Sequence, residues 1–266
     1  MSKTLKKLYL IIIYIFLYAP VITLIVFSFN SSKSRAHWGG FTFKWYGDLF
    51  HDKQIMSSLY YTVAIALLSS LIATIAGTAA AVAIHNMNKH LRSIVMNVTY
   101  LPVLNPDIVT GISLMILFIF VKLELGFVTL LLAHITFNIP YIILSVLPKL
   151  KQLNKHMYEA ALDLGAVPVK AFFKVILPEI MPGIITGFLL AFTLSLDDFI
   201  ISFFTTGSGV STLSITVYSM ARRGINPKIN ALSTLMFITV LGLLLVINKR
   251  SSANNKNETA RLTNLI

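Results

Sequence analysis

Long apolar runs separated by short polar segments dominate this chain. Six runs are long enough to cross a bilayer as helices, which takes about 20 residues. They occupy residues 8–29, 59–85, 94–121, 126–147, 181–203 and 230–248. The pattern predicts an all-α membrane protein with six transmembrane helices in one domain, residues 1–250. Residues 251–266 are rich in Ser, Asn and Lys, which predicts a disordered tail.

The first apolar run begins like a signal peptide, because Lys3, Lys6 and Lys7 precede it. The run is longer than the roughly 7–15 apolar residues of a signal peptide, and no clear cleavage site of small residues follows. We therefore expect an uncleaved first transmembrane helix.

One polar segment, residues 149–179, is long enough to fold into structure of its own. Its first half has apolar residues at helical spacing, namely Leu153, Met157, Ala160, Ala161 and Leu164. The opposite side carries the charged residues Lys151, Lys155, Glu159 and Asp163. Gly165 stands where a left-handed residue would end this helix. A first short helix that ends at Gly165 is therefore predicted.

The second half of this segment predicts another short helix. Pro168 suits its first turn. One face is apolar, with Val169, Phe172, Phe173 and Ile176, and the other carries Lys170 and Lys174. We expect Pro178 and Pro182 to start the fifth transmembrane helix.

Composition excludes several classes of protein. The chain is 56% hydrophobic and 12% charged, whereas soluble domains average about 25% charged residues. It contains no cysteine, which excludes disulfides and thiolate metal sites. It also lacks the G-x-x-x-x-G-K-[ST] pattern of a P-loop, so any ATP-driven step requires a separate subunit.

The basic residues predict which side of the membrane each loop faces. With the N-terminus inside, 14 Lys and Arg residues fall in inner segments and 8 in outer segments. This bias favours both termini, and the 149–179 loop, on the cytoplasmic side. The net charge of +12 is then mostly a matter of topology and requires no nucleic-acid partner.

Two acidic residues in the 149–179 loop are placed unfavourably for an isolated helix. Glu159 and Asp163 are four residues apart and repel each other by a few tenths of a kcal/mol. Asp163 also lies in the last turn, where the helix dipole disfavours an anion. A cationic residue of a partner would relieve both effects. A solvated surface hairpin, with Lys155 near Glu159, is the alternative.

The loop resembles the E-A-A segment of ABC-importer permeases. The pattern of that segment is E-A-A followed by three residues, a glycine, nine residues and I-x-L-P. This chain has Glu159-Ala160-Ala161, Gly165 and then Val175-Ile176-Leu177-Pro178, with Val175 in place of the usual Ile. In that family the loop forms a coupling helix that sits in a groove of a cytoplasmic ATPase. The resemblance assigns ATPase coupling to Glu159, Ala160, Ala161, Asp163, Gly165, Val175, Leu177 and Pro178.

The wider sequence is similar to spermidine/putrescine permeases, and most closely to their second permease subunit. The similar segments are FLYAPVITLIVFSFNSSK (16–33), NPDIVTGISL (105–114), LSLDDFIISFFTTG (194–207) and INPKINAL (225–232). The resemblance implies the fold of type I importer permeases (MetI-like) in a bacterial inner membrane. The implied partners are a second homologous permease subunit, two ATPase subunits that bind ATP and Mg, a periplasmic polyamine-binding protein and membrane lipid. No cofactor is expected in this chain.

Three carboxylates lie within the apolar runs, where ionisable groups are costly and usually functional. Asp107 lies about 22 Å beyond Arg92 along the third helix, and Asp197 and Asp198 lie about 23 Å beyond Pro182 along the fifth. No Lys or Arg is available at that depth, so these carboxylates suit a polycation. Nearby aromatic rings could add cation–π contacts, from Phe118, Phe199, Phe203 and Phe204.

These carboxylates also have structural interpretations. Asp107 follows Pro106 and could cap a helix after a kink. Asp197 and Asp198 point about 100° apart on a helix, so both are not expected to face one path. We favour Asp107 and Asp198 as path residues, and one of the adjacent pair could contact a neighbouring subunit.

Other polar and aromatic residues are expected to pack rather than bind. His134 and Asn138, four residues apart in the fourth run, predict hydrogen bonds between helices. Trp38, Trp45 and Tyr46 in the outer loop 30–57 are typical of an aromatic belt. A contact of this loop with a binding protein is the alternative.

Three rival functions remain open. An importer of another solute, such as an anion or a sugar, predicts basic or neutral residues in the membrane, whereas this chain has aspartates. A secondary transporter would not need the 149–179 loop. An intramembrane hydrolase would need paired catalytic groups at one depth, and none is present. The sequence does not distinguish spermidine from putrescine.

Overall fold

A computed structural model describes residues 3–34, 37–223, 227–242 and 244–245. These residues form helices joined by loops, and their one β-bridge joins Asn30 to Phe41. The chain divides into two compact units, of which the first comprises Met1–Leu59 with Leu213–Gly242. The second comprises Tyr60–Thr212. The predicted tail, residues 251–266, lies outside the described residues.

The first unit begins with α1, Lys3–Ser28, an apolar helix whose side chains are largely exposed. Its other helices are α2 (Lys44–Phe50), the start of α3 (Lys53–Asn86), α11 (Leu213–Arg223) and the helix Pro227–Gly242. Apolar residues from all of these except α1 form its core, namely Trp45, Leu49, Ile55, Leu213, Ala231 and Leu232.

A buried asparagine organises the loop after α1. The Asn30 side chain is 1% exposed, and its Oδ1 accepts the backbone N–H groups of Ser32 and Gly39. Its Nδ2 donates to the carbonyl of His37, and its own carbonyl accepts the indole N–H of Trp45 at 2.6 Å. Because a buried amide must find such partners, Asn30 fixes the shape of this loop.

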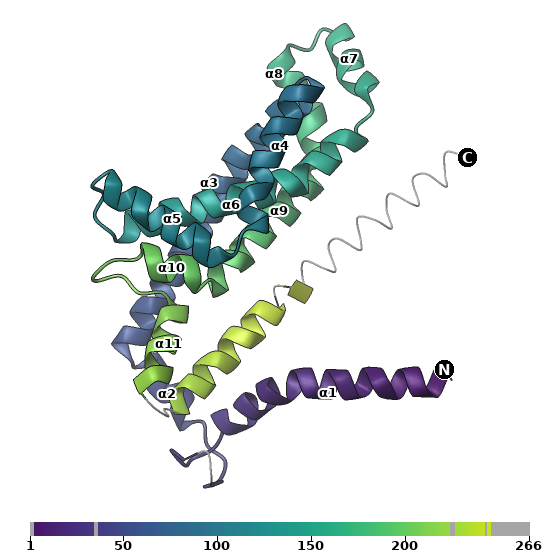
Figure 1. Cartoon of the computed structure of the whole chain (residues 1–266). Coiled ribbons are helices and arrows are strands. Elements are labelled where there is room, and N and C mark those ends of the chain that lie inside the picture. The colour runs from purple at the N-terminus through teal and green to yellow at the C-terminus, as the bar shows by residue number, and fades with distance from the viewer. Residues whose placement is uncertain (1–2, 35–36, 224–226, 243, 246–266) are drawn as a thin grey trace. The chain divides into compact units, whose positions relative to one another are not determined.

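The second unit contains most of the helices (Figure 1). After α3 they are α4 (Lys89–Leu104), α5 (Asp107–Phe120), α6 (Phe127–Gln152), α7 (Lys155–Asp163), α8 (Pro168–Ala171), the π-helical turn η1 (Phe172–Ile176), α9 (Leu177–Asp197) and α10 (Ile200–Thr205). The most extensive pairing is between α6 and α9, and α10 packs mainly on α5.

Glycines allow the helices of the second unit to approach closely. A Cβ atom on Gly183 would lie 2.9 Å from the carbonyl oxygen of Ser145 in α6, and one on Gly77 in α3 would lie 2.7 Å from the Cβ of Ile142. Both distances are shorter than van der Waals contact allows. Small residues at helix interfaces are a general means of packing helices in membranes.

The third predicted helix, 94–121, is wrong as a continuous element. The chain breaks after Leu104 and resumes at Asp107, and α4 and α5 are bent by 105°. Pro106 explains the break, because a proline disfavours helical conformation in the preceding residue and cannot donate to the previous turn. Pro106 also occupies the N-cap position of α5 and makes no side-chain cap. The alternative that Asp107 caps this helix is therefore wrong.

The fifth predicted helix, 181–203, also differs from the structure. It begins before Pro178, because α8, η1 and α9 form one continuous helical segment, Pro168–Asp197. The N–H of Leu177 donates to the carbonyl of Phe172 in the wider π turn. This turn carries the helix past Pro178, which has no N–H of its own. At the other end, the segment stops at Asp197 and α10 is a separate helix.

Length and composition make four described segments candidate membrane spans, namely Leu5–Ser28, Lys53–Asn86, Phe127–Gln152 and Pro168–Asp197. The bent pair of α4 and α5 forms a fifth. The helix Pro227–Gly242 is apolar but shorter, and the predicted run 230–248 ends partly outside the described residues.

Candidate functional site

The first half of the 149–179 loop folds into the short helix expected from its sequence, α7, whereas its second half is the start of the continuous helical segment Pro168–Asp197. The side chain of Asn154 caps α7 by accepting the N–H of His156 at 3.0 Å. At the other end, Gly165 has a φ of 83°. Gly165 donates to the carbonyl of Leu162 at 2.8 Å, and Ala166 donates to that of Ala161 at 3.0 Å. This pair of bonds is a Schellman motif, so the predicted left-handed C-cap is confirmed.

The residues of the E-A-A segment divide into an exposed and a packed group. Glu159, Ala160 and Asp163 are exposed on α7. Leu177 packs against the buried core of the second unit, and Val175 is half-buried. In Figure 1, α7 and α8 lie together at one end of α6 and α9. The loop therefore presents α7 outward while its other half is part of the packed helices.

Large apolar side chains are exposed at the tip of this loop. Leu164 is 89% exposed, and Val167 and Val169 are 62% and 67% exposed. The expected apolar face of the first helix is therefore not buried within this chain at Leu164. Exposed apolar residues that cluster beside charged ones are typical of a surface for another protein.

Glu159 has a polar neighbour on its own helix. His156 Nδ1 lies 3.2 Å from the Glu159 carboxylate, one helical turn away, and both side chains are exposed. The side chain of Lys155, the expected partner, lies outside what the structure describes. Exposed pairs of this kind contribute little to stability.

The three carboxylates predicted for the substrate path lie in two different environments. Asp107 is the first residue of α5 and is exposed, and Asp197 is the last residue of α9 and is exposed. Asp198 has only 8% of its side chain exposed. Of the aromatic residues named beside them, Phe118 is buried in the core, whereas Phe203 is 47% exposed.

Asp198 makes well-defined contacts within this chain. Its carboxylate accepts the backbone N–H groups of Ile201 at 3.2 Å and Ser202 at 2.7 Å. It therefore caps α10, as aspartate commonly does at a helix N-terminus. Its Oδ2 also lies 3.6 Å from His134 Nε2 in α6. These contacts favour a structural role for Asp198 and leave Asp107 and Asp197 as the carboxylates that face outward.

The predicted hydrogen bonds of His134 and Asn138 between helices are confirmed. His134 Nε2 lies 3.0 Å from Ser202 Oγ of α10. Asn138 Nδ2 donates to Ser195 Oγ of α9 at 2.9 Å and to Ser69 Oγ of α3 at 3.3 Å. Both side chains of α6 are fully buried. Within the described residues, no cluster of three or more His, Asp or Glu could hold a metal.

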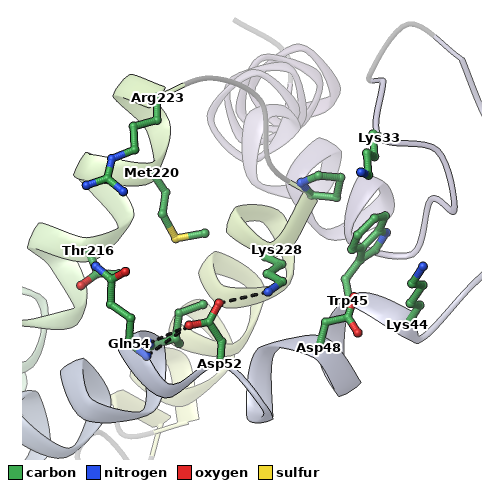
Figure 2. Close-up of a pocket in the computed structure, with 12 residues that line it drawn as sticks. Lys33, Lys44, Trp45, Asp48, Asp52, Gln54, Thr216, Met220, Arg223 and Lys228 are labelled. Carbon is green, nitrogen blue, oxygen red and sulfur yellow. Dashed lines mark hydrogen bonds and ion pairs between the residues drawn. The ribbon is translucent and has the colours of Figure 1, made fainter.

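The first unit contains a cavity of about 610 Å³ (Figure 2). Its charged residues are Lys33, Lys44, Asp48, Asp52, Arg223 and Lys228. The buried ring of Trp45 and the side chain of Met220 from α11 also line it. The cavity therefore has two more cationic side chains than carboxylates.

One carboxylate of this cavity is already paired. Lys228 Nζ donates to Asp52 Oδ2 at 3.0 Å, and the other oxygen of Asp52 accepts backbone N–H groups at the start of α3. Partial burial raises the pKa of Asp52, but the bonds from Lys228 and the backbone outweigh it and hold the pKa below its usual value. Within the described residues, Lys33, Lys44 and Arg223 have no ion-pair partner.

Sequence reasoning named Trp45 in the outer loop but missed the cavity around it. Its charged residues come from two segments more than 150 residues apart, and no local pattern connects Asp52 with Lys228. The only feature of the sequence that pointed to this cavity was the presence of several Lys and Arg residues in the two predicted outer loops that form it.

The sequence of the chain matches a known protein family. The family model described as a binding-protein-dependent transport system inner membrane component matches residues 72–249. The chain therefore belongs to this family of membrane permease components, as its 149–179 loop and apolar helices indicated.

Among individual relatives, the chain is similar to two polyamine permeases of Escherichia coli K12. It is 38% identical to the spermidine/putrescine transport system permease protein PotC over 257 residues, 97% of both chains. It is 42% identical to the putrescine transport system permease protein PotI over 229 residues, 83% of this chain and 81% of that protein. It is also 35% identical over 251 residues to PotC of Haemophilus influenzae, covering 94% of this chain and 98% of that protein.

Solved structures share the fold. A permease chain of a bacterial ABC transporter that imports the acidic polysaccharide alginate aligns with a TM-score of 0.71 and 18% identity, covering 94% of this chain and 95% of that one. The MetNI methionine ABC transporter aligns with a TM-score of 0.61 and 19% identity, covering 76% of this chain and 98% of that one. The all-helical part of the expected fold class is confirmed for the described residues, and these structural neighbours are chains of ABC transporters.

Proposed function

We propose that this chain is a permease subunit of an ATP-driven polyamine importer. The observation that carries the proposal is its similarity, over nearly its whole length, to permeases of spermidine and putrescine transport systems. Its exposed carboxylates at the ends of apolar helices support a cationic substrate. The chain itself performs no chemistry, because permease subunits form the path and separate ATPase subunits hydrolyse ATP with Mg.

The proposed assembly has the partners that the sequence implied. One domain, residues 1–250, contributes six transmembrane helices with both termini in the cytoplasm of a bacterial cell, in the inner membrane. A second homologous permease subunit completes the path. Two ATPase subunits bind at the cytoplasmic face, and a periplasmic binding protein delivers the polyamine. A solved relative in complex with its substrate-bound periplasmic protein supports this last partner.

We assign ATPase coupling to the 149–179 loop. Glu159, Ala160 and Asp163 are exposed on α7, and exposed Leu164 and Val167 follow directly. An ATPase groove with apolar walls and a cationic residue would bury these apolar side chains and relieve the repulsion between the two acids. Motion of the ATPases would then reach α6 and α9, which begin and end the loop.

A single substitution tests this coupling assignment. Glu159→Ala should lower uptake and binding-protein-stimulated ATP hydrolysis about tenfold, the effect of losing ~1.4 kcal/mol at an interface. The control Glu124→Ala removes an exposed carboxylate from the loop between α5 and α6 and should leave both rates unchanged. Uptake is measured with labelled spermidine and normalised to transporter in the membrane. Wild-type uptake by Glu159→Ala would refute the assignment.

We propose that the exposed carboxylates line the polyamine path. A cation beside a carboxylate at the end of α9 is also attracted by the C-terminal carbonyls of that helix. Asp197 occupies this position. Asp107 and Asp197 could therefore replace water around an ammonium group as it passes, while Asp198, although part of the same acidic pair, holds α10.

Neutralising the two exposed carboxylates should weaken substrate binding. Asp107→Asn and Asp197→Asn each remove a charged acceptor, whose hydrogen bonds are worth about 1.5–3 kcal/mol. Each should raise the KM for spermidine uptake about tenfold or more, while basal ATP hydrolysis stays near its wild-type rate. Glu124→Gln serves as the isosteric control. Unchanged KM values in both variants would remove the acidic path from the account.

We propose that the cavity of the first unit, on the predicted periplasmic side, receives acidic side chains of the binding protein. The cations that have no ion-pair partner among the described residues, Lys33, Lys44 and Arg223, are complementary to carboxylates and repel a free polyamine. Asn30 and Trp45 hold the surrounding loop in one shape before any partner arrives, which lowers the entropy lost on binding.

Two lysines that begin neighbouring helices provide a matched test. Lys44 starts α2 and lines the cavity, whereas Lys53 starts α3 and does not. Lys44→Glu should raise several-fold the concentration of binding protein that half-saturates ATPase stimulation, most strongly at low salt. Lys53→Glu changes the net charge equally and should have little effect. Equal effects of both variants would show a general charge effect and contradict a site.

A putrescine-selective permease is the second candidate. The chain is 42% identical to the putrescine permease and 38% identical to the spermidine/putrescine permease, which favours putrescine selectivity. The alignment with the putrescine permease is the shorter of the two. An importer of another small solute stays a further alternative. Competition of labelled spermidine by putrescine, in a strain carrying the whole system, separates these functions.

A further inference from the structure

His134 has an environment that packing alone does not explain. It lies within α6, in a candidate membrane span, and its side chain is 0% exposed. Burying a polar ring is unfavourable unless it forms hydrogen bonds. Its Nε2 lies 3.0 Å from Ser202 Oγ and 3.6 Å from Asp198 Oδ2, and its Nδ1 forms no hydrogen bond within the described chain.

The partners of His134 determine which nitrogen carries the proton. The hydrogen bond of Nε2 is to Ser202 Oγ, and the Asp198 carboxylate, 3.6 Å away, favours a proton rather than a lone pair on the nitrogen that faces it. His134 is therefore a buried donor that faces the start of α10 from α6.

The same partners fix the junction between α9 and α10. Asp198, the residue between the two helices, has extended backbone with ψ of 129°, and its carboxylate binds the N–H groups of Ile201 and Ser202. The contact with His134 ties this cap to α6. The exposed Asp197 directly precedes it, so the direction of the Asp197 side chain depends on how this junction is held.

The junction also supports the second exposed carboxylate. α10 packs on α5, where a Cβ atom on Gly111 would lie 3.2 Å from the ring of Phe204 and 3.5 Å from the carbonyl of Ile200. Asp107 begins α5, one turn before Gly111. A shift of α10 would therefore displace α5 as well as the end of α9.

We propose that His134 is a positioning residue for transport, whose Nε2–H bonds Ser202 and faces the Asp198 carboxylate, and so holds the junction of α9 with α10 in the geometry in which Asp197 and Asp107 present their carboxylates to the substrate. The inference rests on the proposed function, since it assigns these two carboxylates to the polyamine path. His134 itself does not contact the substrate. The adjacent aspartates then have separate roles, Asp198 in the junction and Asp197 in the path.

Two amides distinguish a donor at Nε2 from a polar residue in general. The side-chain N–H group of Gln reaches about as far as Nε2 of histidine, whereas that of Asn ends near Nδ1. His134→Gln should therefore keep the KM for labelled spermidine within about twofold of wild type. His134→Asn should raise it about fivefold, as expected for loss of a typical buried hydrogen bond.

A double-mutant cycle tests whether His134 acts through the junction. Ser202→Ala removes one acceptor with little change in volume and should raise the KM in the same direction. Asp197→Asn should raise the KM by a smaller factor in the His134→Asn background than in the wild-type background. The reason is that His134→Asn has already displaced the carboxylate that Asp197→Asn neutralises. A purely structural role would lower the amount of transporter and leave the KM of each molecule unchanged.

The outcomes separate this inference from the proposed function. Equal KM values for His134→Gln and His134→Asn, with wild-type uptake intact, would overturn the role of His134 alone. Additive effects of His134→Asn and Asp197→Asn would overturn its action through the junction. If the wild-type system takes up neither spermidine nor putrescine, the proposed function itself fails.

Discussion

The close packing of α9 on α6 is the constraint on which the second unit depends. Gly183 and Gly187 leave space that the backbone and side chains of α6 occupy, so the two helices approach more closely than larger residues allow. The core of this unit is centred on the same pair, with Ile142, Val146 and Ile180 fully buried. Because α6 enters the 149–179 loop and α9 leaves it, this contact makes the loop and the two helices one packed structure.

This packed structure has a functional element at each end. The E-A-A segment lies at one end, and the junction of α9 with α10 lies at the other. His134 is 18 residues before the end of α6, a distance of about 27 Å along a helix. His134 therefore forms its hydrogen bond near the N-terminal end of α6. The Schellman motif at Gly165 lies in the loop that follows the C-terminal end. A rigid pair of helices between them is a physical means of connecting ATP hydrolysis with the path.

Local patterns in the sequence predicted the elements that local chemistry controls. Gly165 ends α7 in the left-handed conformation because glycine adopts it without strain, and Pro168 begins the next helix. The apolar runs located every long helix. Proline was a less reliable guide, because Pro140 and Pro148 lie inside α6 while Pro106 separates α4 from α5. The sequence shows where a break is possible and does not show its angle.

Features that depend on tertiary contacts could not be predicted in the same way. Asp197 and Asp198 are identical neighbours in an apolar run, and only the start of α10 and the position of His134 distinguish them. The cavity of the first unit depends on Lys228 and Asp52, which are 176 residues apart. Leu164 lies on the apolar face expected for the first helix, and its high exposure is explained only by the place of the loop at one end of α6 and α9.

The surface of α7 that we propose to contact an ATPase connects ATP hydrolysis with transport. The chain has no cysteine, so Ala160→Cys introduces a single thiol on the exposed side of α7. In membranes that contain the whole system, a short thiol-to-amine crosslinker should join this variant to the ATPase subunit, and crosslinking should abolish uptake. The control Glu124→Cys should form no such product. If Ala160→Cys does not crosslink to the ATPase in an assembly that transports normally, the coupling surface lies elsewhere and the central claim is wrong.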